Sequence, residues 1–360
     1  MGDPINGRNS FIVTTYLANK EHDIRLIRWL LKSICLWPRS GKASIVDRVL
    51  SEFLIFTCFS LLFMTIVSMG LVIFVEKRED MDVMMINMGP FVYLLMTVMK
   101  YTCLIVHVDD IRKCIDCIEL DWDIVKTVED YEVMLKDAKI GRFVATCITL
   151  FVYCTIQSYN ITRCFMKTVV NVDNVSVLTR GLPYPFYNEI VDTRFSPAYE
   201  IVLVIHFVSG FLLCNITNVN CGLMAILVMH ACGQLKILIQ WLGDIVQEDD
   251  VIDISTVQQK LGFIVEHHLQ VIKFVSHTEN IMYLTCLVEL LGGSILLCFA
   301  GYCCLTAWHK AETENIPVYS VIVVSVILNI FIICYIAEVL SEQVLKASMT
   351  YLNMLRQIAV

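Results

Sequence analysis

The stretch Phe53-Leu-Ile-Phe-Thr-Cys-Phe-Ser-Leu-Leu-Phe-Met-Thr-Ile-Val-Ser-Met-Gly-Leu-Val-Ile-Phe-Val75 contains no charged residue. A helix rises about 1.5 Å per residue, so a stretch of this length can cross a hydrocarbon core of about 30 Å. The whole chain has the same character, because 57% of its 360 residues are hydrophobic and only 17% are charged. Soluble domains are about 45–50% apolar and roughly 25% charged. The composition therefore predicts an integral membrane protein.

Five further apolar segments of membrane length follow the first one, at residues 83–108, 143–162, 196–235, 281–304 and 316–337. After them, residues 344–360 form a short helical pattern in which polar residues are mixed with apolar ones. We expect an all-α polytopic membrane protein with six clear transmembrane helices. Its parts are a cytoplasmic segment 1–52, a transmembrane region 53–343 and a C-terminal helix 344–360.

The distribution of basic residues indicates the orientation. Lysine and arginine collect in the cytoplasmic connections of membrane proteins. With the N-terminus inside, the leading segment holds eight of them, the connection 109–142 six and the connection 236–280 three. The outer connections then hold two, three and one, with Arg163 at a boundary. The count predicts a cytoplasmic N-terminus, whereas a G-protein-coupled receptor needs the opposite.

The connections have patterns of their own. Segments 109–142 and 236–280 predict cytoplasmic helical extensions that pack on each other and on neighbouring subunits. The outer loop 163–196 contains a sequon at Asn174, which this orientation makes accessible to glycosylation. Residues 22–38 carry an apolar stripe beside basic residues and end at Pro38. That pattern is typical of an amphipathic helix lying at the membrane interface.

The sequence shows no chemistry of an enzyme. It has no glycine-rich phosphate loop and no nucleophile elbow. The pair His267-His268 has no companion ligands for zinc, so no metal or other cofactor is expected. A net charge of −8 argues against nucleic acid as a partner. The sixteen cysteines fall mostly in apolar segments, where they act as small hydrophobic residues. The sequence leaves undecided whether one disulfide forms among Cys164, Cys303 and Cys304.

Two ionisable residues fall inside the predicted spans. Lys100 is close to the cytoplasmic end of the second span, so we expect its amine to reach towards the interface. Glu289 lies within the fifth span, where an ionised carboxylate is costly. Two roles are open for it: structural burial in a protonated or paired form, or contact with ions that makes the protein sensitive to pH.

Several stretches carry a resemblance to a known family. They are Ile27-Arg-Trp-Leu-Leu-Lys-Ser-Ile-Cys-Leu-Trp-Pro38, Leu182-Pro-Tyr-Pro-Phe186, Ser196-Pro-Ala-Tyr-Glu200, Glu266-His-His-Leu-Gln-Val-Ile-Lys-Phe274 and Ile333-Cys-Tyr-Ile-Ala-Glu-Val-Leu-Ser-Glu-Gln343. In the tail, Thr350-Tyr351 and Gln357 add to them. Together, and in the expected order, they resemble the insect odorant receptor family. A gustatory receptor of the same superfamily is the nearest alternative, and a transporter is disfavoured because internal repeats are missing.

The resemblance implies an odorant-gated, non-selective cation channel of the plasma membrane, assembled as a heterotetramer with the odorant co-receptor and in contact with membrane lipid. It implies a pocket for a small volatile ligand between the second, third, fourth and sixth spans. The candidate residues are Met88, Phe91, Tyr93, Tyr153, Gln157, His206, Gly210, Tyr319 and Ile322. In the last helix the resemblance gives Met354 and Ile358 as the hydrophobic gate of the pore, with Gln357 as its polar neighbour.

The resemblance also reveals a gap. Family members have a cytoplasmic helix, a linker and the first part of the seventh helix after the sixth span. Here Gln343 is followed directly by Val344, in the middle of that last helix. We therefore expect a truncated seventh helix, which forms either one long helix with the sixth span or a kink near residues 341–343. The gap indicates a splice variant or a truncated form, and puts conduction in question.

Overall fold

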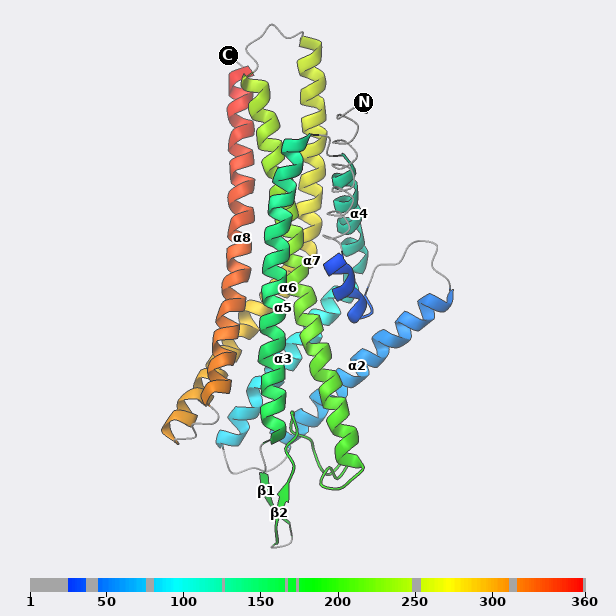
Figure 1. Cartoon of the computed structure of the whole chain (residues 1–360), viewed down its shortest axis with the longest axis vertical. Coiled ribbons are helices and arrows are strands. Elements are labelled where there is room, and N and C mark those ends of the chain that lie inside the picture. The colour runs from blue at the N-terminus through cyan, green and yellow to red at the C-terminus, as the bar shows by residue number, and fades with distance from the viewer. Residues whose placement is uncertain are drawn as a thin grey trace, which may run out of the picture.

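The computed structural model describes residues 25–36, 45–75, 81–124, 127–165, 168–172, 175–247, 254–310 and 316–358. The helices are α2 (Ile45–Phe74), α3 (Met81–Val106), α4 (Val108–Ile124), α5 (Val128–Phe165), α6 (Ala198–Gln247), α7 (Ile254–His309) and α8 (Ile316–Ile358). A further helical segment covers residues 25–33. Strands β1 (Thr168–Val172) and β2 (Val175–Thr179) pair antiparallel in the outer loop, which the all-α expectation did not include. Figure 1 shows most of the helices aligned along one long axis.

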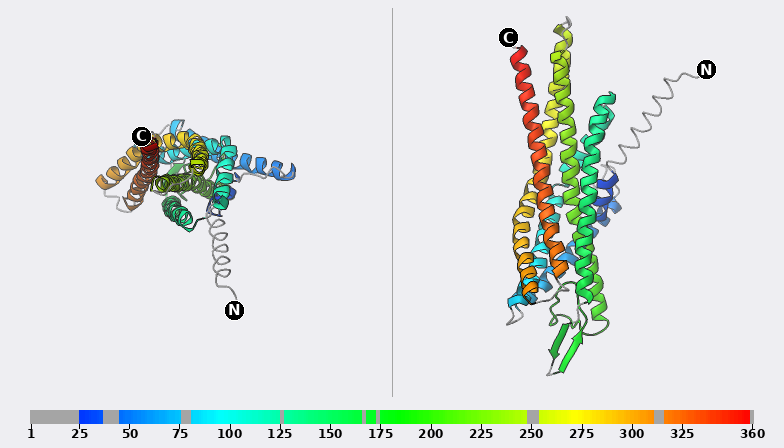
Figure 2. Two further views of the ribbon diagram at one scale, coloured as in Figure 1. Left: turned by 90° about the horizontal axis from the view of Figure 1, so that it is seen from above. Right: turned by 60° about the vertical axis from the view of Figure 1, so that its left-hand side comes forward.

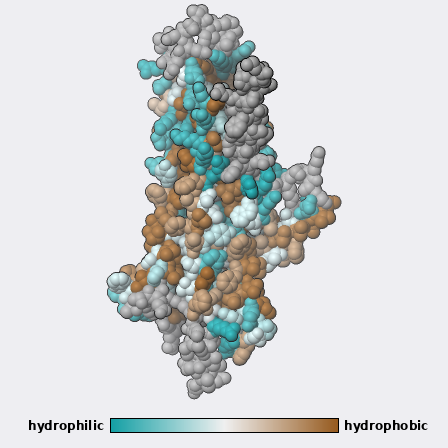
Figure 3. Space-filling model, viewed as in Figure 1, coloured by the Kyte–Doolittle hydropathy of each residue, from teal (hydrophilic) through white to brown (hydrophobic). Residues whose placement is uncertain are grey.

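The six predicted spans are confirmed in number and place. Within the described residues, α2, α3, α5, α6, α7 and α8 are long and apolar enough to cross a membrane. Figure 3 shows hydrophobic residues gathered on the half of the molecule towards β1 and β2, while hydrophilic residues cover much of the other half. We call these halves the hairpin end and the distal end. The expected helical membrane protein is therefore observed.

Three helices extend far beyond the apolar half. α6, α7 and α8 contain 50, 56 and 43 residues. At about 1.5 Å per residue, each is twice or more the length of a hydrocarbon core of about 30 Å. Figures 1 and 2 show that all three reach the distal end, where α6 ends and α7 begins. The distal parts of these helices therefore lie outside the apolar belt.

The predicted helical extensions pack on each other through buried polar contacts. Asp121 of α4 accepts a hydrogen bond at 2.8 Å from His230 Nε2 of α6. Asp137 of α5 is 1% exposed and binds the Lys236 amine of α6 at 2.6 Å. His267 of α7 is also buried, with its ring centre 5.0 Å from that of Trp241 of α6. These contacts fix the distal parts of α4 to α7 as one unit.

The segment at residues 25–33 is helical as predicted, but its apolar stripe packs on protein and not on a lipid surface. Its apolar stripe is buried in protein: Leu30, Leu31 and Ile34 are at most 1% exposed and belong to the main core. A Cβ built on Gly222 of α6 would lie 3.2 Å from Leu30, so the helix packs closely on α6 there. Periodicity reports an apolar face, but it does not say whether protein or lipid covers that face.

One hydrogen bond fastens this segment to α3. The Tyr101 hydroxyl donates to the Ile34 carbonyl oxygen at 3.1 Å, and Tyr101 is fully buried. Replacing Tyr101 by phenylalanine is expected to lower the free energy of unfolding by about 1 kcal/mol, the usual net value of a buried hydrogen bond. Unfolding in detergent micelles followed by circular dichroism measures this. The matched control is Tyr283→Phe, since Tyr283 is 69% exposed; equal effects of both changes would contradict the prediction.

The last helix settles one of the open alternatives. α8 runs without interruption from Ile316 to Ile358, through Gln343 and Val344. The sixth span and the tail therefore form one long helix, and the kink near residues 341–343 is not observed. Ser348 and Thr350 donate their hydroxyls to backbone carbonyl oxygens one turn back, so these polar groups are satisfied within the helix.

The outer loop answers two further questions. Asn174 lies outside the described residues, so its glycosylation stays a prediction. The sixteen cysteines, all within the described part of the chain, carry free thiols, Cys164, Cys303 and Cys304 included. The disulfide left open by the sequence is therefore not formed. Close to the same end, Asp82 of α3 accepts from Lys310 at 2.6 Å and from Tyr302 at 2.7 Å, which joins the start of α3 to the end of α7.

Candidate functional site

A cavity of about 300 Å³ lies between α3, α5, α7 and α8, within the apolar half of the molecule. Tyr184 of the outer loop and Thr217 of α6 complete its wall. Most of the wall is apolar; its large apolar side chains are Ile86, Met96, Ile148, Phe151, Val152, Ile156, Leu296, Phe299, Ile322, Val326, Leu328 and Ile332. Mostly apolar cavities with a few polar groups are the usual form of small-molecule sites.

Helix periodicity explains why these residues share one wall. On α7, Glu289, Gly293, Leu296, Ala300 and Cys303 follow each other at intervals of three or four residues. Residues spaced in this way lie on one face of a helix. The same intervals recur on α5 and α8 among the lining residues. Each helix therefore presents one stripe to the cavity.

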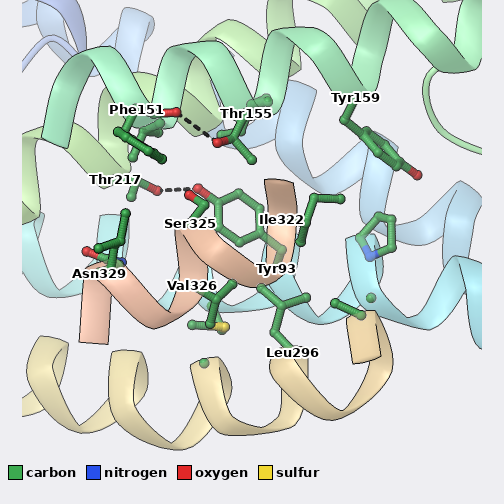
Figure 4. A pocket seen from close by; sticks show the side chains of 18 of the residues that line it. Tyr93, Phe151, Thr155, Tyr159, Thr217, Leu296, Ile322, Ser325, Val326 and Asn329 are labelled. Atoms are coloured by element: carbon green, nitrogen blue, oxygen red, sulfur yellow. Dashed lines mark hydrogen bonds between the residues drawn. The ribbon is translucent and has the colours of Figure 1, made fainter. Parts of the chain in front are cut away.

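Tyr93 of α3 reaches into the middle of the cavity. Figure 4 shows its ring between Ile322, Ser325 and Val326 of α8, with its hydroxyl towards Thr217. The two hydroxyl oxygens are 2.8 Å apart and share a hydrogen bond. The contact gives both hydroxyl groups a partner in a mostly apolar wall and fixes the ring position.

A charged cluster closes the cavity at the end away from the hairpin. Glu289 of α7 lines the cavity and pairs with the Lys100 amine of α3 and the Asn329 amide of α8. Lys100 is only 1% exposed, so the prediction that its amine reaches the interface is wrong. An opposite charge lay within reach, and pairing two charges in a membrane costs less than leaving either one alone. For Glu289, paired burial is confirmed.

Comparisons with known proteins agree with this architecture. The sequence profile described as "7tm Odorant receptor" matches residues 80–348, most of the chain. The chain belongs to the odorant receptor family. Among the alternatives considered from the sequence, this match selects the odorant receptor over the G-protein-coupled receptor and the transporter. A search of curated protein sequences found no match.

Solved structures resemble the fold of this receptor. The insect olfactory receptor OR5 from Machilis hrabei superposes with a TM-score of 0.69 at 16% identity, over 92% of this chain and 82% of that one. The same receptor in complex with eugenol gives a TM-score of 0.66 at 13% identity, over 96% and 90% of the two chains. At these identities the likeness concerns the fold.

Three of the nine predicted ligand residues of the receptor line the cavity: Tyr93, Tyr319 and Ile322. The other six do not. Met88 and Phe91 pack against the main core on other faces of α3, and Tyr153 donates a hydrogen bond to the Asn215 side chain at 2.6 Å. Gln157 is half-buried on α5.

His206 and Gly210 lie directly behind the wall of the cavity. The His206 ring is 5.4 Å from that of Tyr184, which does line the cavity. A Cβ built on Gly210 would lie 3.6 Å from the Tyr184 hydroxyl. Both residues therefore support Tyr184 in its position instead of facing the cavity.

The predicted gate lies at the distal end of α8. Met354 is 1% exposed and packs with Leu238 and Leu242 of α6 and Ile264 of α7. Gln357 and Ile358 belong to the last turn of the same helix. Their role in a pore stays a prediction.

In the described residues, no group of three or more metal-ligating side chains occurs.

The sequence reasoning missed the α7 wall and most of the α5 wall. The resemblance named the second, third, fourth and sixth spans, yet the fifth span contributes Glu289, Gly293, Leu296, Phe299, Ala300 and Cys303. Glu289 is the feature of the sequence that could have indicated the α7 wall. A carboxylate in a span is unusual enough to mark a functional face, and the neighbours of that face follow at three and four residues.

Proposed function

We propose that the chain is an odorant receptor subunit that binds small, volatile, hydrophobic molecules in the cavity between α3, α5, α7 and α8. The observation that supports this most is the cavity itself, which is mostly apolar and is lined by residues of five spans with a few polar groups among them. The related receptor of similar fold has been solved in complex with eugenol, a small volatile compound. For this chain, shape and the few polar groups select the ligand.

We place the receptor in the plasma membrane with its N-terminus in the cytoplasm. The excess of lysine and arginine in the leading segment and in the connections 109–142 and 236–280 supports this orientation. It makes the distal end cytoplasmic and the hairpin end extracellular. The cavity then lies in the outer part of the bundle, where a volatile ligand arriving from outside can reach it.

A role as an ion channel requires assembly with the co-receptor and a last helix that can line the pore. In the family, the seventh helix lines a pore in a heterotetramer with the co-receptor. Here α8 spans the membrane once and its tail continues in the same direction to the distal end, where Met354 packs on α6 and α7. A helix that leaves the membrane cannot return without a turn. We propose that this form binds odorant but supplies no pore helix, and so does not conduct.

Odorant-evoked current tests both parts. The chain is expressed with the co-receptor, beside a version in which the missing segment between Gln343 and Val344 is restored from a full-length relative. We expect current only from the restored version, when a panel of small alcohols, phenols, esters and ketones is applied. Current of equal size from both versions would contradict the non-conducting role, while surface biotinylation confirms that both reach the membrane.

A further inference from the structure

The Glu289 carboxylate is the most unusual feature of the cavity. It is the charged side chain among the described lining residues of a mostly apolar wall, on the face of α7 that also presents Gly293 and Leu296. Glu289 is 6% exposed and its two neighbours come from two other spans, Lys100 from α3 and Asn329 from α8. The carboxylate is therefore held in one position by groups on both sides of α7.

The hydrogen bonds around the cavity leave unused capacity at this carboxylate. An ionised carboxylate accepts about four hydrogen bonds. Among the described residues Glu289 has two partners, the Lys100 amine and the Asn329 amide. Tyr93 and Thr217 share a hydrogen bond, and Thr155 donates to the Phe151 carbonyl oxygen, as Figure 4 shows. Lining hydroxyl groups can also accept, but Glu289 is the charged acceptor among the described lining residues, and it has capacity left.

We propose that Glu289 is the polar anchor of the cavity and selects ligands that carry a hydroxyl group, alcohols or phenols, over ligands that only accept hydrogen bonds. This inference rests on the proposed ligand-binding role of the cavity. The ligand hydroxyl donates to a free lone pair of the carboxylate, and its hydrocarbon part packs against Leu296, Ile322 and Val326. Lys100, which does not line the cavity, and Asn329, which does, position the carboxylate.

The physical reason is that the Glu289 carboxylate attracts the hydroxyl hydrogen of an alcohol and repels the lone pairs of an ether oxygen. A hydrogen bond to a charged group stabilises by more than one between neutral groups, and a low dielectric strengthens it. An ether or ester of similar shape brings only lone pairs, which the carboxylate repels. The hydration that the ether or ester oxygen loses on binding is then not replaced by a hydrogen bond. We therefore expect a preference of about tenfold or more for the hydroxyl ligand.

Two isomers of one formula make the sharpest test. 1-Octanol donates and accepts a hydrogen bond, whereas heptyl methyl ether only accepts one. Their dissociation constants are measured by equilibrium dialysis with the full chain in lipid nanodiscs, with empty nanodiscs to subtract partition into lipid. The native chain is expected to bind the alcohol at least about tenfold more tightly. Equal affinities in the native chain overturn the inference without any variant.

Variants assign the preference to Glu289. The double change Lys100→Met with Glu289→Leu removes both charges, so it leaves no single charge stranded; it is expected to abolish the preference. Ser294→Ala removes an exposed hydroxyl of α7 that does not line the cavity, and this control variant is expected to keep the preference. A preference that survives the double change, or is lost in Ser294→Ala, overturns the role of Glu289.

A blocking variant separates this inference from the proposed function. Val326→Trp fills the cavity, while Val324→Trp is its control, because Val324 is 47% exposed on the other side of α8. If Val326→Trp binds neither ligand while Val324→Trp binds both, the cavity is confirmed as the binding site. If both ligands bind Val326→Trp normally, the cavity is not the site and both proposals fail. If the block works but the isomers bind equally, only the hydroxyl preference fails.

Discussion

Replacing Glu289 alone by leucine is expected to destabilise the receptor by about 3–5 kcal/mol, the usual cost of breaking a buried ion pair by removing one partner. The change leaves the Lys100 amine, 1% exposed, without its counter-charge in the interior of the bundle. Its remaining neighbour is the Tyr93 ring, whose centre is 6.0 Å away. That contact compensates only a small part of the loss. Unfolding in mixed detergent micelles, followed by circular dichroism, measures the change.

The double variant is the control for this prediction. Lys100→Met together with Glu289→Leu removes both charges and keeps the side-chain volumes similar. Replacement of a buried ion pair by apolar residues is often neutral or stabilising. We therefore expect the double variant to recover most of the loss. A double variant as unstable as Glu289→Leu would show that lost packing, not the unpaired charge, causes the destabilisation.

The second large effect is expected at Gly141, where α5 crosses α6. A Cβ built on Gly141 would lie 3.2 Å from the Met229 Cβ and 3.3 Å from the Ala225 carbonyl oxygen. The second of these is backbone and cannot move without moving α6. Gly141→Leu is expected to lower the free energy of unfolding by about 1–3 kcal/mol, because overpacking forces the helices apart. Thermal unfolding of the purified receptor measures it.

Gly243 of α6 provides the matched comparison, since a Cβ built there meets nothing within 4 Å. Leucine is a better helix former than glycine by roughly 0.5–1 kcal/mol, so Gly243→Leu is expected to be neutral or stabilising. The two changes then have opposite signs although the chemical replacement is the same. A stable Gly141→Leu variant would show that α5 and α6 do not approach as closely as described.

The cavity shows how far prediction from sequence reaches. The resemblance names the spans of α3, α5, α6 and α8 but not that of α7. Tyr93, Tyr319 and Ile322 line the cavity, and their contact with a ligand stays a prediction. Met88 and Phe91 lie on α3 as well, only a few residues away, yet they pack elsewhere. One residue rotates the direction of a helical side chain by about 100°, so a span can be right while the face is wrong.

The ionisable residues show a different limit. The sequence marks an ionised Glu289 as costly and leaves pairing as one of two outcomes, but it names no partner. The position of Lys100 near the end of its span predicts an amine at the interface. Which charge meets which depends on how α3 and α7 are rotated and shifted against each other. Hydropathy along one segment contains no information on that.

The sequence by itself determined the membrane class, the six spans and their order, and it indicated the odorant receptor family. Each of these follows from properties that are read along the chain: apolar length against bilayer thickness, and motifs in a fixed order. It also limited the last helix to two forms, one of which is observed.

Only the tertiary structure decided the rest. It buried the segment at residues 25–33 against α6, paired Lys100 with Glu289 and Asn329, and gave the fifth span a wall of the cavity. These features join residues from different helices, so they depend on which faces meet. An apolar helix face can be covered by lipid or by protein at similar cost. In this receptor, close packing and a buried charge pair determine which faces are covered by protein.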